Sequence, residues 1–353
     1  MPDIPFKGIL NRDSEHHGDF VLVRSSGGPL AAACIESASH PEAIEKAAQI
    51  IRRGGLVAFP TETVYGLGAD ACNPIAVARI FEAKNRPWID PIIVHVADSK
   101  SAMPYGNFPK YAIGLTDKFW PGPLTLVVHK TAVIPPIVTA GLDTVAIRVP
   151  AHPAALSLIR ASGCAIAAPS ANPFGYVSPT KAEHVAEQLA DRIDLILDGG
   201  ACAVGVESTI LSLAGQRPCI LRSGGVPIEE LELVVGKLSC SAGATRRPCA
   251  PGQLTRHYAT QTKLKIAWEE DEELHPGERV GLVSLTAPSD PHRYAAVEVL
   301  SPSGSMREAA ANLFAALRRL DGLGLDRLIA RPVREEDLGT AIMDRLRRCS
   351  AKD

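Results

Sequence analysis

The chain has 353 residues, of which 46% are hydrophobic and 22% are charged, and its formal net charge is −2. This length suits two domains better than one, and the small net charge argues against bulk affinity for nucleic acid or membranes, though not against a local basic groove. No segment has the unbroken apolar length of a membrane span, and Met1–Leu10 lacks a signal-peptide pattern, so a soluble, cytoplasmic protein is expected.

From His40 onward, helical and strand patterns alternate. Residues 1–38 show little periodicity and are interpreted as an N-terminal extension of unknown role, with a packed extra strand, an assembly element and a disordered leader as the alternatives. Apolar spacing predicts a first helix in 41–52, which Pro41 opens and Gly54–Gly55 close. Further helices are predicted at 74–84, 109–119, 153–161, 180–193 and 228–236, and strands at 56–60, 91–97, 123–129, 144–150, 164–170, 194–200, 208–214 and 219–223. Residues 39–235 therefore read as an α/β (α+β) domain whose sheet is covered by helices.

A change of composition marks a second domain. Residues 236–262 are rich in Gly, Ser, Pro and Arg and are interpreted as a linker. Strands are then predicted at 263–268, 279–285, 295–301 and 327–333, with helices at 305–324 and 340–349. Residues 263–353 would form a small accessory α/β domain. The eight cysteines form no CxxC pair, and most lie in apolar contexts, which predicts buried free thiols in a reducing compartment.

Three stretches place hydroxyls, amides and glycines where strands end, which is where open α/β sheets bind ligands. They are 59–70, 167–182 and 205–210, the last followed by 221–225. Such groups hold phosphate or carboxylate oxygens, although Ser178 or Thr180 could equally cap a helix. His95, inside an apolar strand, is more typical of a satisfied core histidine. No P-loop, dinucleotide fingerprint, Ser-His-Asp set, HExxH or metal cluster is present.

Buried or paired cations point to an anionic ligand. If the segment after the helix at 74–84 is extended, Lys84 and Arg86 face the same side, and two such cations repel unless a polyanion lies between them. The alternative is a pair of solvated surface charges. Arg148 lies in the middle of the apolar strand TVAIRVP, where a guanidinium requires an oxyanion partner from protein or ligand. Arg222 repeats this pattern in CILRSGG.

A series of motifs in fixed order makes the chain similar to a known family. They are HPEAIEKAAQIIRRGGLVAFPTETVYGLGADA, IFEAKNRP, WPGPLTLVV, AGLDTVAIRVPAHP, AAPSAN, SPTKAEHV, GVESTI and LRSGG. This set, which spans residues 40–235, resembles the threonylcarbamoyl-AMP synthase family with its YrdC-like fold. The later APGQLTRHYA and GTAIMDRLRR resemble the two-domain branch of that family, in which a linker crosses the active site to an accessory domain.

The resemblance implies a fold and a reaction. It implies a YrdC-like twisted mixed sheet with a large, positively lined cavity, and a small Rossmann-like C-terminal domain. It implies condensation of L-threonine, bicarbonate and ATP to threonylcarbamoyl-AMP with release of pyrophosphate, a step in making N6-threonylcarbamoyladenosine at position 37 of tRNA. Magnesium is expected with ATP and no organic cofactor is expected. Further expected partners are the downstream threonylcarbamoyl-transferase complex and, weakly, tRNA.

The resemblance also assigns roles to residues. Lys84 and Arg86 would be catalytic, holding the ATP phosphates and offsetting charge on departing pyrophosphate. The implied ATP-binding set is Lys84, Arg86, Thr144, Ser170, Asn172, Ser178 and Arg222. The implied threonine-binding set is Thr61, His95, Arg148, Ala168 and Ser208, with Arg148 as the carboxylate clamp. His257 and Tyr258 would close over the site as a lid, and no residue is assigned to a metal.

Two departures and two alternative functions accompany this interpretation. Asp90 stands where the family usually has Asn, and a carboxylate there opposes phosphate binding unless it turns away or holds a metal. LRSGG stands where RPG is commoner. A non-catalytic RNA-binding protein is disfavoured because only 5% of residues are aromatic. A transferase for carbamoyl-adenylate is disfavoured because a carbamoyl group offers Arg148 no carboxylate to bind.

Overall fold

The computed structural model describes residues 33–240, 248–253, 257–269 and 273–351. The large body contains β1 (Cys34–Ser37), α1 (Pro41–Arg52), β2 (Val57–Phe59), β3 (Gly66–Asp70), α2 (Pro74–Lys84), β4 (Ile93–His95), α3 (Ser99–Ala102), β5 (Gly106–Asn107), α4 (Ala112–Phe119), β6 (Leu124–Lys130), β7 (Thr144–Arg148), α5 (Pro153–Ser162), β8 (Ile166–Ala167), α6 (Ala182–Leu189), β9 (Leu195–Asp198), β10 (Thr209–Ser212), β11 (Cys219–Arg222), α7 (Ile228–Val235) and β12 (Ser239–Cys240). The small body contains β13 (Leu264–Ile266), β14 (Val280–Ser284), the 3₁₀ turn η1 (Pro291–Arg293), β15 (Ala296–Val299), α8 (Met306–Asp321), β16 (Arg327–Ala330) and α9 (Gly339–Ser350).

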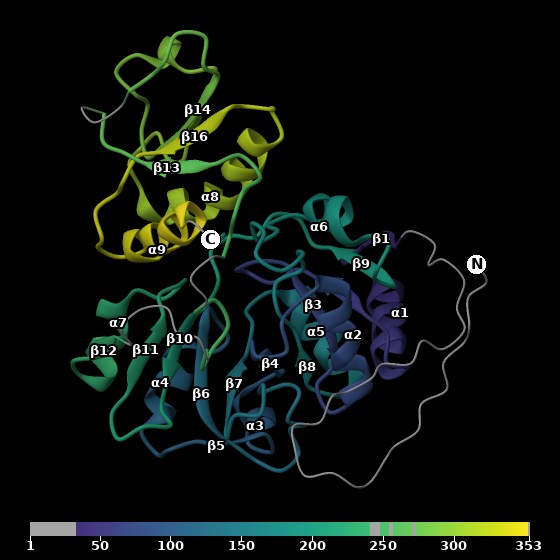
Figure 1. Ribbon diagram of the computed structural model, residues 1–353. Helices are drawn as coiled ribbons and strands as arrows, with labels where there is room; N and C mark the ends of the chain where they lie inside the picture. Colours follow the sequence, from purple (N-terminus) through teal and green to yellow (C-terminus); the bar gives the residue numbers. More distant parts are fainter. Residues whose placement is uncertain (1–32, 241–247, 254–256, 270–272, 352–353) are drawn as a thin grey trace, which may run out of the picture.

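Each body is built on one sheet, and Figure 1 shows the small body, green to yellow, lying above the large one. The large sheet is mixed, in the order β1-β9-β2-β3-β8-β4-β7-β6-β10-β11-β12 with β5 paired to β6. The small sheet is parallel, in the order β13-β16-β14-β15. A mixed sheet with helices and a small parallel α/β sheet are the fold class that the sequence predicts.

The helix α2 shows how local chemistry places a site residue. The Asn73 side chain accepts hydrogen bonds from two backbone N–H groups of the first turn, and Pro74 occupies the position where a missing N–H costs nothing. The helix ends at Lys84 because Asn85 adopts a left-handed conformation, with φ 51° and ψ 41°. This turn places Lys84 beside the loop that follows β8 and Arg86 beside the loop that precedes β4.

The two faces of the large sheet are covered unequally. Alternate strand residues pack on one side against α1 and α5, and on the other side against α2, α4, α6 and α7. Over β4, β7, β6 and β10 the first side has no helix among the described residues. Its apolar side chains, such as Ala146 and Ile210, contact Ala250 of the linker instead. On this side, the strip of sheet over β4, β7, β6 and β10 therefore lacks a covering helix in the described part of the chain.

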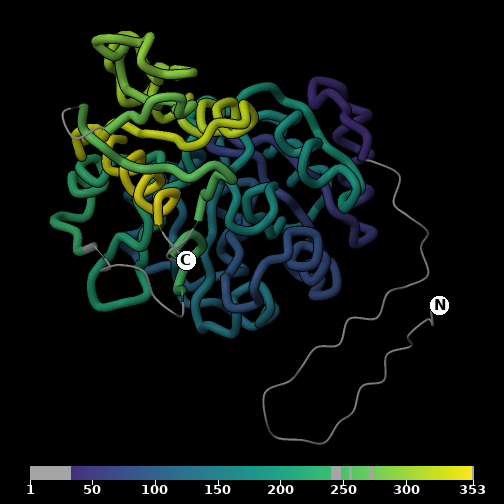
Figure 2. The backbone as a smooth tube through the Cα atoms, turned by 45° about the horizontal axis from the view of Figure 1, so that its top comes forward, coloured from purple at the N-terminus to yellow at the C-terminus, as the bar shows by residue number. Residues whose placement is uncertain are grey.

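The small body packs on the large one through a shared apolar core. The helices α8 and α9 lie on the side of the small sheet that faces the large body, and Figure 2 shows the two bodies in close contact. Val64, Val177 and Val206 of the large body join one cluster with residues of α8 and α9. Such an interface favours a single arrangement of the two bodies.

The structure adds to or corrects three sequence interpretations. Residues 34–37 form the edge strand β1 paired in parallel with β9, so this end of the N-terminal extension is a packed extra strand, one of the alternatives left open. The stretch GLGAD forms strand β3, which its two glycines hide from a propensity argument. Among the seven described cysteines only Cys202 and Cys349 are buried, so the prediction that most are buried is wrong. None of the helices in the described ranges combines the length and apolar character needed to cross a bilayer.

Candidate active site

A cavity lies at the strip of sheet that the linker covers. It is lined by residues in or next to the strands β2, β3, β4, β7, β8, β10 and β11, by Arg86 after α2, and by two linker segments: Thr61, Thr63, Val64, Gly66, Arg86, Ile93, His95, Arg148, Ala168, Pro169, Ser170, Glu207, Ser208, Arg222, Pro251, Gly252, His257 and Tyr258. The cavity encloses about 40 Å³, whereas sites for small molecules usually measure roughly 300–1,000 Å³. The linker therefore closes this space in the present conformation.

Ten of the fourteen residues predicted for the site line this cavity. They are Thr61, Arg86, His95, Arg148, Ala168, Ser170, Ser208, Arg222, His257 and Tyr258. Lys84, Thr144, Asn172 and Ser178 do not line it. Thr144 starts β7 and Arg148 ends it, so the two side chains share a face and lie about 13 Å apart along the strand. The role of Thr144 toward ATP stays a prediction.

Lys84 is buried behind the loop that carries Ser170 and Asn172. Its Nζ donates to the carbonyl of Ser170 at 2.5 Å and to the carbonyl of Asn172. The Asn172 amide in turn donates to the carbonyls of Pro173 and Tyr176. Burial, followed by the nearby charge of Arg86, holds the pKa of Lys84 well below its usual value. Lys84 thus organises the Ser170–Asn172 loop from behind.

Arg86 reaches the cavity but is held by its own loop. Its guanidinium donates to the carbonyls of Asp90 (3.1 Å) and Pro91 (2.7 Å), and lies 2.9 Å from the Asp90 carboxylate. Asp90 is completely buried, and burial raises its pKa although Arg86, Lys84 and Arg222 oppose the shift. Asp90 therefore turns inward, where it does not line the cavity, and serves as the counter-ion of Arg86.

Arg148 is held by a carboxylate that the sequence analysis overlooked. Its NH2 lies 2.5 Å from Glu62, its NH1 donates to Thr63 at 2.9 Å, and its Nε donates to the carbonyl of Gly122 at 3.2 Å. A guanidinium has five N–H donors, so these three contacts leave two N–H groups without a partner in the described part of the chain. Two free donors on a buried planar cation suit a carboxylate ligand.

His95 ends β4, next to Arg148 on β7. Its ring is buried, and its Nδ1 has no hydrogen-bond partner among the described residues. Burial, followed by the charge of Arg148, lowers the pKa of His95 to about 3, so the imidazole is neutral at ordinary pH. A ring nitrogen that is buried, unpartnered and on the cavity wall fits a ligand-binding histidine better than a satisfied core histidine.

Ser178 and Glu207 form a buried polar pair beside the cavity. The Ser178 hydroxyl donates to Glu207 at 2.6 Å, and Lys181 rather than Ser178 or Thr180 precedes helix α6, so the interpretation of these hydroxyls as helix caps is wrong. Arg222 donates to the carbonyl and the hydroxyl of Ser208 and to the carbonyl of Pro251. Strand-end hydroxyls and guanidiniums from separate elements thus meet at one place.

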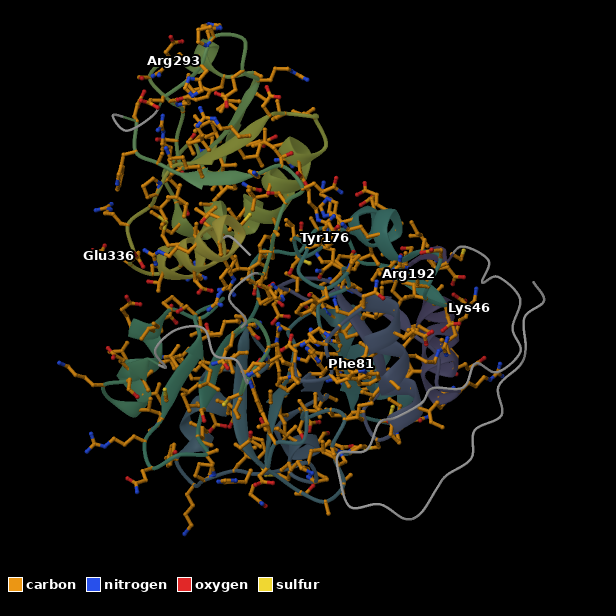
Figure 3. The ribbon with its side chains drawn as sticks, in the orientation of Figure 1. Lys46, Phe81, Tyr176, Arg192, Arg293 and Glu336 are labelled. Atoms are coloured by element: carbon orange, nitrogen blue, oxygen red, sulfur yellow. The ribbon has the colours of Figure 1, made fainter. Side chains whose placement is uncertain are left out.

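The linker residues His257 and Tyr258 form one wall of the cavity. Tyr258 is completely buried with φ 64°, a left-handed conformation that costs a side chain of this size on the order of 1 kcal/mol. Its ring stacks on Phe314 of α8 at 5.4 Å, and its hydroxyl has no partner in the described chain. Residue Ala259 then pairs with Tyr176, which Figure 3 places where the two bodies meet.

The described residues contain no group of three His, Cys, Asp or Glu that could hold a metal ion. The carboxylates at the cavity, Glu62, Asp90 and Glu207, each form an ion pair with an arginine. Sequence reasoning missed all three pairings. The available signal was that buried arginines at strand ends need counter-ions, and that PTETV and GVESTI each supply one next to a predicted ligand residue.

Comparisons with known proteins agree over nearly the whole chain. The family model Sua5_yciO_yrdC, described as telomere recombination, matches residues 49–224, and the model described as threonylcarbamoyl-AMP synthase, C-terminal domain, matches residues 226–351. A threonylcarbamoyl-AMP synthase of Pyrococcus abyssi is 44% identical, covering 87% of this chain and 94% of that relative. One of Bacillus subtilis is 43% identical, covering 88% and 94%.

Solved structures give the same result. The crystal structure of P. abyssi Sua5 complexed with L-threonine is 43% identical, with a TM-score of 0.83 over 88% of this chain and 95% of that chain. A second structure of P. abyssi Sua5, in a doubly substituted form, has a TM-score of 0.85 over 90% of this chain. The agreement covers both bodies and the linker between them.

Proposed function

The chain belongs to the threonylcarbamoyl-AMP synthase family, and we propose that it condenses L-threonine, bicarbonate and ATP to threonylcarbamoyl-AMP, releasing pyrophosphate and water. Three buried arginines from separate segments, Arg86, Arg148 and Arg222, line one cavity. This convergence carries the proposal, because it supplies charge for one carboxylate and for several phosphates at adjacent positions. The named relatives support a synthase over an RNA-binding protein or a carbamoyl-adenylate transferase.

Threonine would bind at the end of the cavity that Arg148 and His95 form. The two remaining N–H groups of Arg148 would donate hydrogen bonds to the threonine carboxylate, while Glu62 keeps the guanidinium in place. Thr61, Ser208 and the backbone at Ala168 complete this end. The neutral Nδ1 of His95 would accept a hydrogen bond from the amino or hydroxyl group of threonine.

The nucleotide would bind along the strip of sheet that runs from Arg148 toward Thr144. Arg86 and Arg222 would face its phosphates, and Ser170 would donate a hydroxyl hydrogen bond. Ser178, whose proton is donated to Glu207, would accept a hydrogen bond from a hydroxyl of the nucleotide's sugar. The carbamate formed from the threonine amine and bicarbonate would attack the α-phosphorus, and the bond to pyrophosphate would break. The cations stabilise the charge that develops on the leaving group, so this step needs position and electrostatics rather than a covalent residue.

The linker must move before this nucleotide can bind. Ala250 belongs to one buried apolar cluster with Ala146, which lies between Thr144 and Arg148, and the enclosed space of about 40 Å³ is far too small for ATP. His257 and Tyr258 would therefore act as a lid that opens for entry and closes over bound substrates. Magnesium would arrive with ATP, held chiefly by phosphate oxygens and water. Delivery of the product to a tRNA-modifying transferase is part of the proposal.

Omission of single substrates tests the proposal. The purified chain is incubated with ATP, bicarbonate and threonine, and pyrophosphate is measured over time. Release that requires all three substrates is expected. Release that persists at the same rate without threonine or without bicarbonate would show that the chain hydrolyses or transfers the nucleotide by another route.

A further inference from the structure

Arg345 of the small body reaches across the interface into the large body. It belongs to α9, and its side chain is completely buried. Its NH1 donates to the carbonyl of Ser223 at 2.5 Å, and its Nε donates to the carboxylate of Glu207 at 3.0 Å. Glu207 and Ser223 flank the cavity residues Ser208 and Arg222 in sequence, so α9 is tied directly to the wall of the site.

Glu207 connects Arg345 to Ser178, a residue predicted to bind ATP. One of its oxygens accepts the hydrogen bond from Arg345, and the other accepts the hydrogen bond from the Ser178 hydroxyl at 2.6 Å. Both oxygens of this buried carboxylate are therefore engaged, one from each body. The orientation of the Ser178 hydroxyl depends on a carboxylate whose position Arg345 sets.

Arg345 also touches the lid. Its guanidinium lies over the Tyr258 ring, 5.4 Å from the centroid, in a cation–π arrangement. The Tyr258 ring also stacks on Phe314 of α8, with 5.4 Å between the two ring centroids. The aromatic wall of the cavity is thus held between two helices of the small body.

The docking of α8 leaves little freedom in this arrangement. Gly205 has φ 73°, and a Cβ added there would lie 2.4 Å from the Cα of Ala311 in α8. Only glycine allows the GVESTI segment to approach the helix this closely. Glu207 lies two residues further along that segment, so the position of the small body determines where its carboxylate stands.

Stability alone is a poor reason for this ion pair. A buried pair seldom stabilises a fold more than apolar residues of the same volume would, because both charges lose their hydration. Removing one partner is costly, however, since it strands the other charge. Burial acts to raise the pKa of Glu207, yet Arg345 and then Arg222 hold it below its usual value. Arg345 keeps Glu207 ionised, and therefore an acceptor for Ser178.

We propose that Arg345 is a positioning residue of the nucleotide site, which aims the Ser178 hydroxyl through Glu207 and holds the Tyr258 ring against the cavity. ATP affinity then depends on how the small body docks, whereas Arg148, Glu62 and His95, at the threonine end, make no hydrogen bond or ion pair with Arg345 in the described part of the chain. The inference rests on the proposed function in that it takes Ser178 to bind ATP.

Steady-state kinetics of the full-length chain test this inference. The variants are Arg345→Met, Arg345→Lys, Ser178→Ala and the double variant Arg345→Met/Ser178→Ala. The matched control is Arg347→Met, since Arg347 lies in the same helix but is half exposed and pairs with Glu335 at the surface. KM is measured separately for ATP and threonine, and ATP affinity is measured by calorimetry without the other substrates.

We expect Arg345→Met to raise KM and Kd for ATP at least tenfold, with KM for threonine changed less than threefold. Arg345→Lys retains the charge and should recover part of the loss. The double variant should bind ATP no more weakly than the weaker-binding of the two single variants, because both substitutions act through the same series of contacts. Arg347→Met should match the unaltered chain in all three constants.

Unchanged ATP affinity in Arg345→Met or Arg345→Lys would overturn the inference, as would fully additive losses in the double variant. The lysine variant decides the question if the methionine variant does not fold. If the unaltered chain binds ATP but makes no adenylate, the proposed function fails. If it makes the adenylate and the variants bind ATP normally, only the inference fails.

Discussion

Replacing Arg148 by methionine tests the threonine end of the site. The side chain is 3% exposed, and two of its five N–H donors lack a partner in the described chain. A hydrogen bond to a charged group contributes about 1.5–3 kcal/mol. Two such bonds to the threonine carboxylate are then worth about 3–6 kcal/mol, which corresponds to a loss of at least about 100-fold in kcat/KM for threonine.

Removal of Arg148 also leaves the Glu62 carboxylate without its counter-ion, so the experiment needs a control for the stability of the fold. An uncompensated buried carboxylate costs about 3–5 kcal/mol, and the double variant Arg148→Met/Glu62→Gln removes that cost. This double variant should regain thermal stability but not threonine affinity. Both should bind ATP with less than threefold change, measured by calorimetry.

A substrate analogue distinguishes the loss of the contact between Arg148 and the threonine carboxylate from general damage to the site. Threoninol has an alcohol in place of the carboxylate, so the unaltered enzyme should use it at least about 100-fold less efficiently than threonine. The double variant should lose most of this discrimination, since neither compound can then contact a guanidinium. If the double variant still discriminates as strongly, another group binds the carboxylate and the assignment of Arg148 is wrong.

Three further changes give defined outcomes. Asp90→Asn removes the counter-ion that lies 2.9 Å from Arg86, so KM for ATP should fall about three- to tenfold; a higher KM would show that Asp90 assists binding. Gly205→Ala would bring a Cβ to 2.4 Å from helix α8 at a positive φ, and should lower the midpoint of thermal unfolding by several degrees. Gly215→Ala is the control, since the nearest atom to its Cβ would be 3.6 Å away, and should not lower the midpoint. Equal midpoints for the two variants would refute the close docking of α8. The pKa of His95 is lowered to about 3 in the folded chain, so between pH 6.5 and 3 the unfolded chain binds a proton that the folded chain does not. The free energy of unfolding should therefore fall as pH falls through this window. In urea titrations, the free energy of unfolding of His95→Leu should fall less steeply with pH, and a pH slope identical to that of the unaltered chain would contradict this prediction.

The sequence predicted most of the fold because its helices carry clear end signals. Asn73, Pro74 and Asn85 delimit α2, and the amphipathic face of 305–324 identifies α8. It failed at β3, whose register depends on partners far along the chain rather than on its glycine-rich composition. Residues 1–32, most of the predicted extension, lie outside the described residues.

Lys84 and Arg86 lie near each other but do not face one site in the way that the sequence argument predicted. The sequence argument assumed an extended chain, in which alternate side chains share a face. The structure has Asn85 in a left-handed turn, and Lys84 supports the loop at Ser170 from behind while Arg86 lines the cavity. Tertiary contacts decided what each cation does.

The acidic partners could not be recognised from residue type. Glu62, Asp90 and Glu207 look unfavourable beside a phosphate site, yet each offsets a buried arginine. Arg345 was hidden in MDRLRR, where three arginines are alike in sequence. Only the docking of α9 separates the buried Arg345 from the exposed Arg347.

The central claim is that one cavity joins threonine and bicarbonate to AMP. The most direct measurement is the separation of products after incubation with ATP, carbon-labelled bicarbonate and threonine carrying a second label. We predict a single new adenylate that contains both labels and forms in equal amount with pyrophosphate. An adenylate that carries threonine label but no bicarbonate carbon, or AMP and pyrophosphate without any adenylate, would contradict the account.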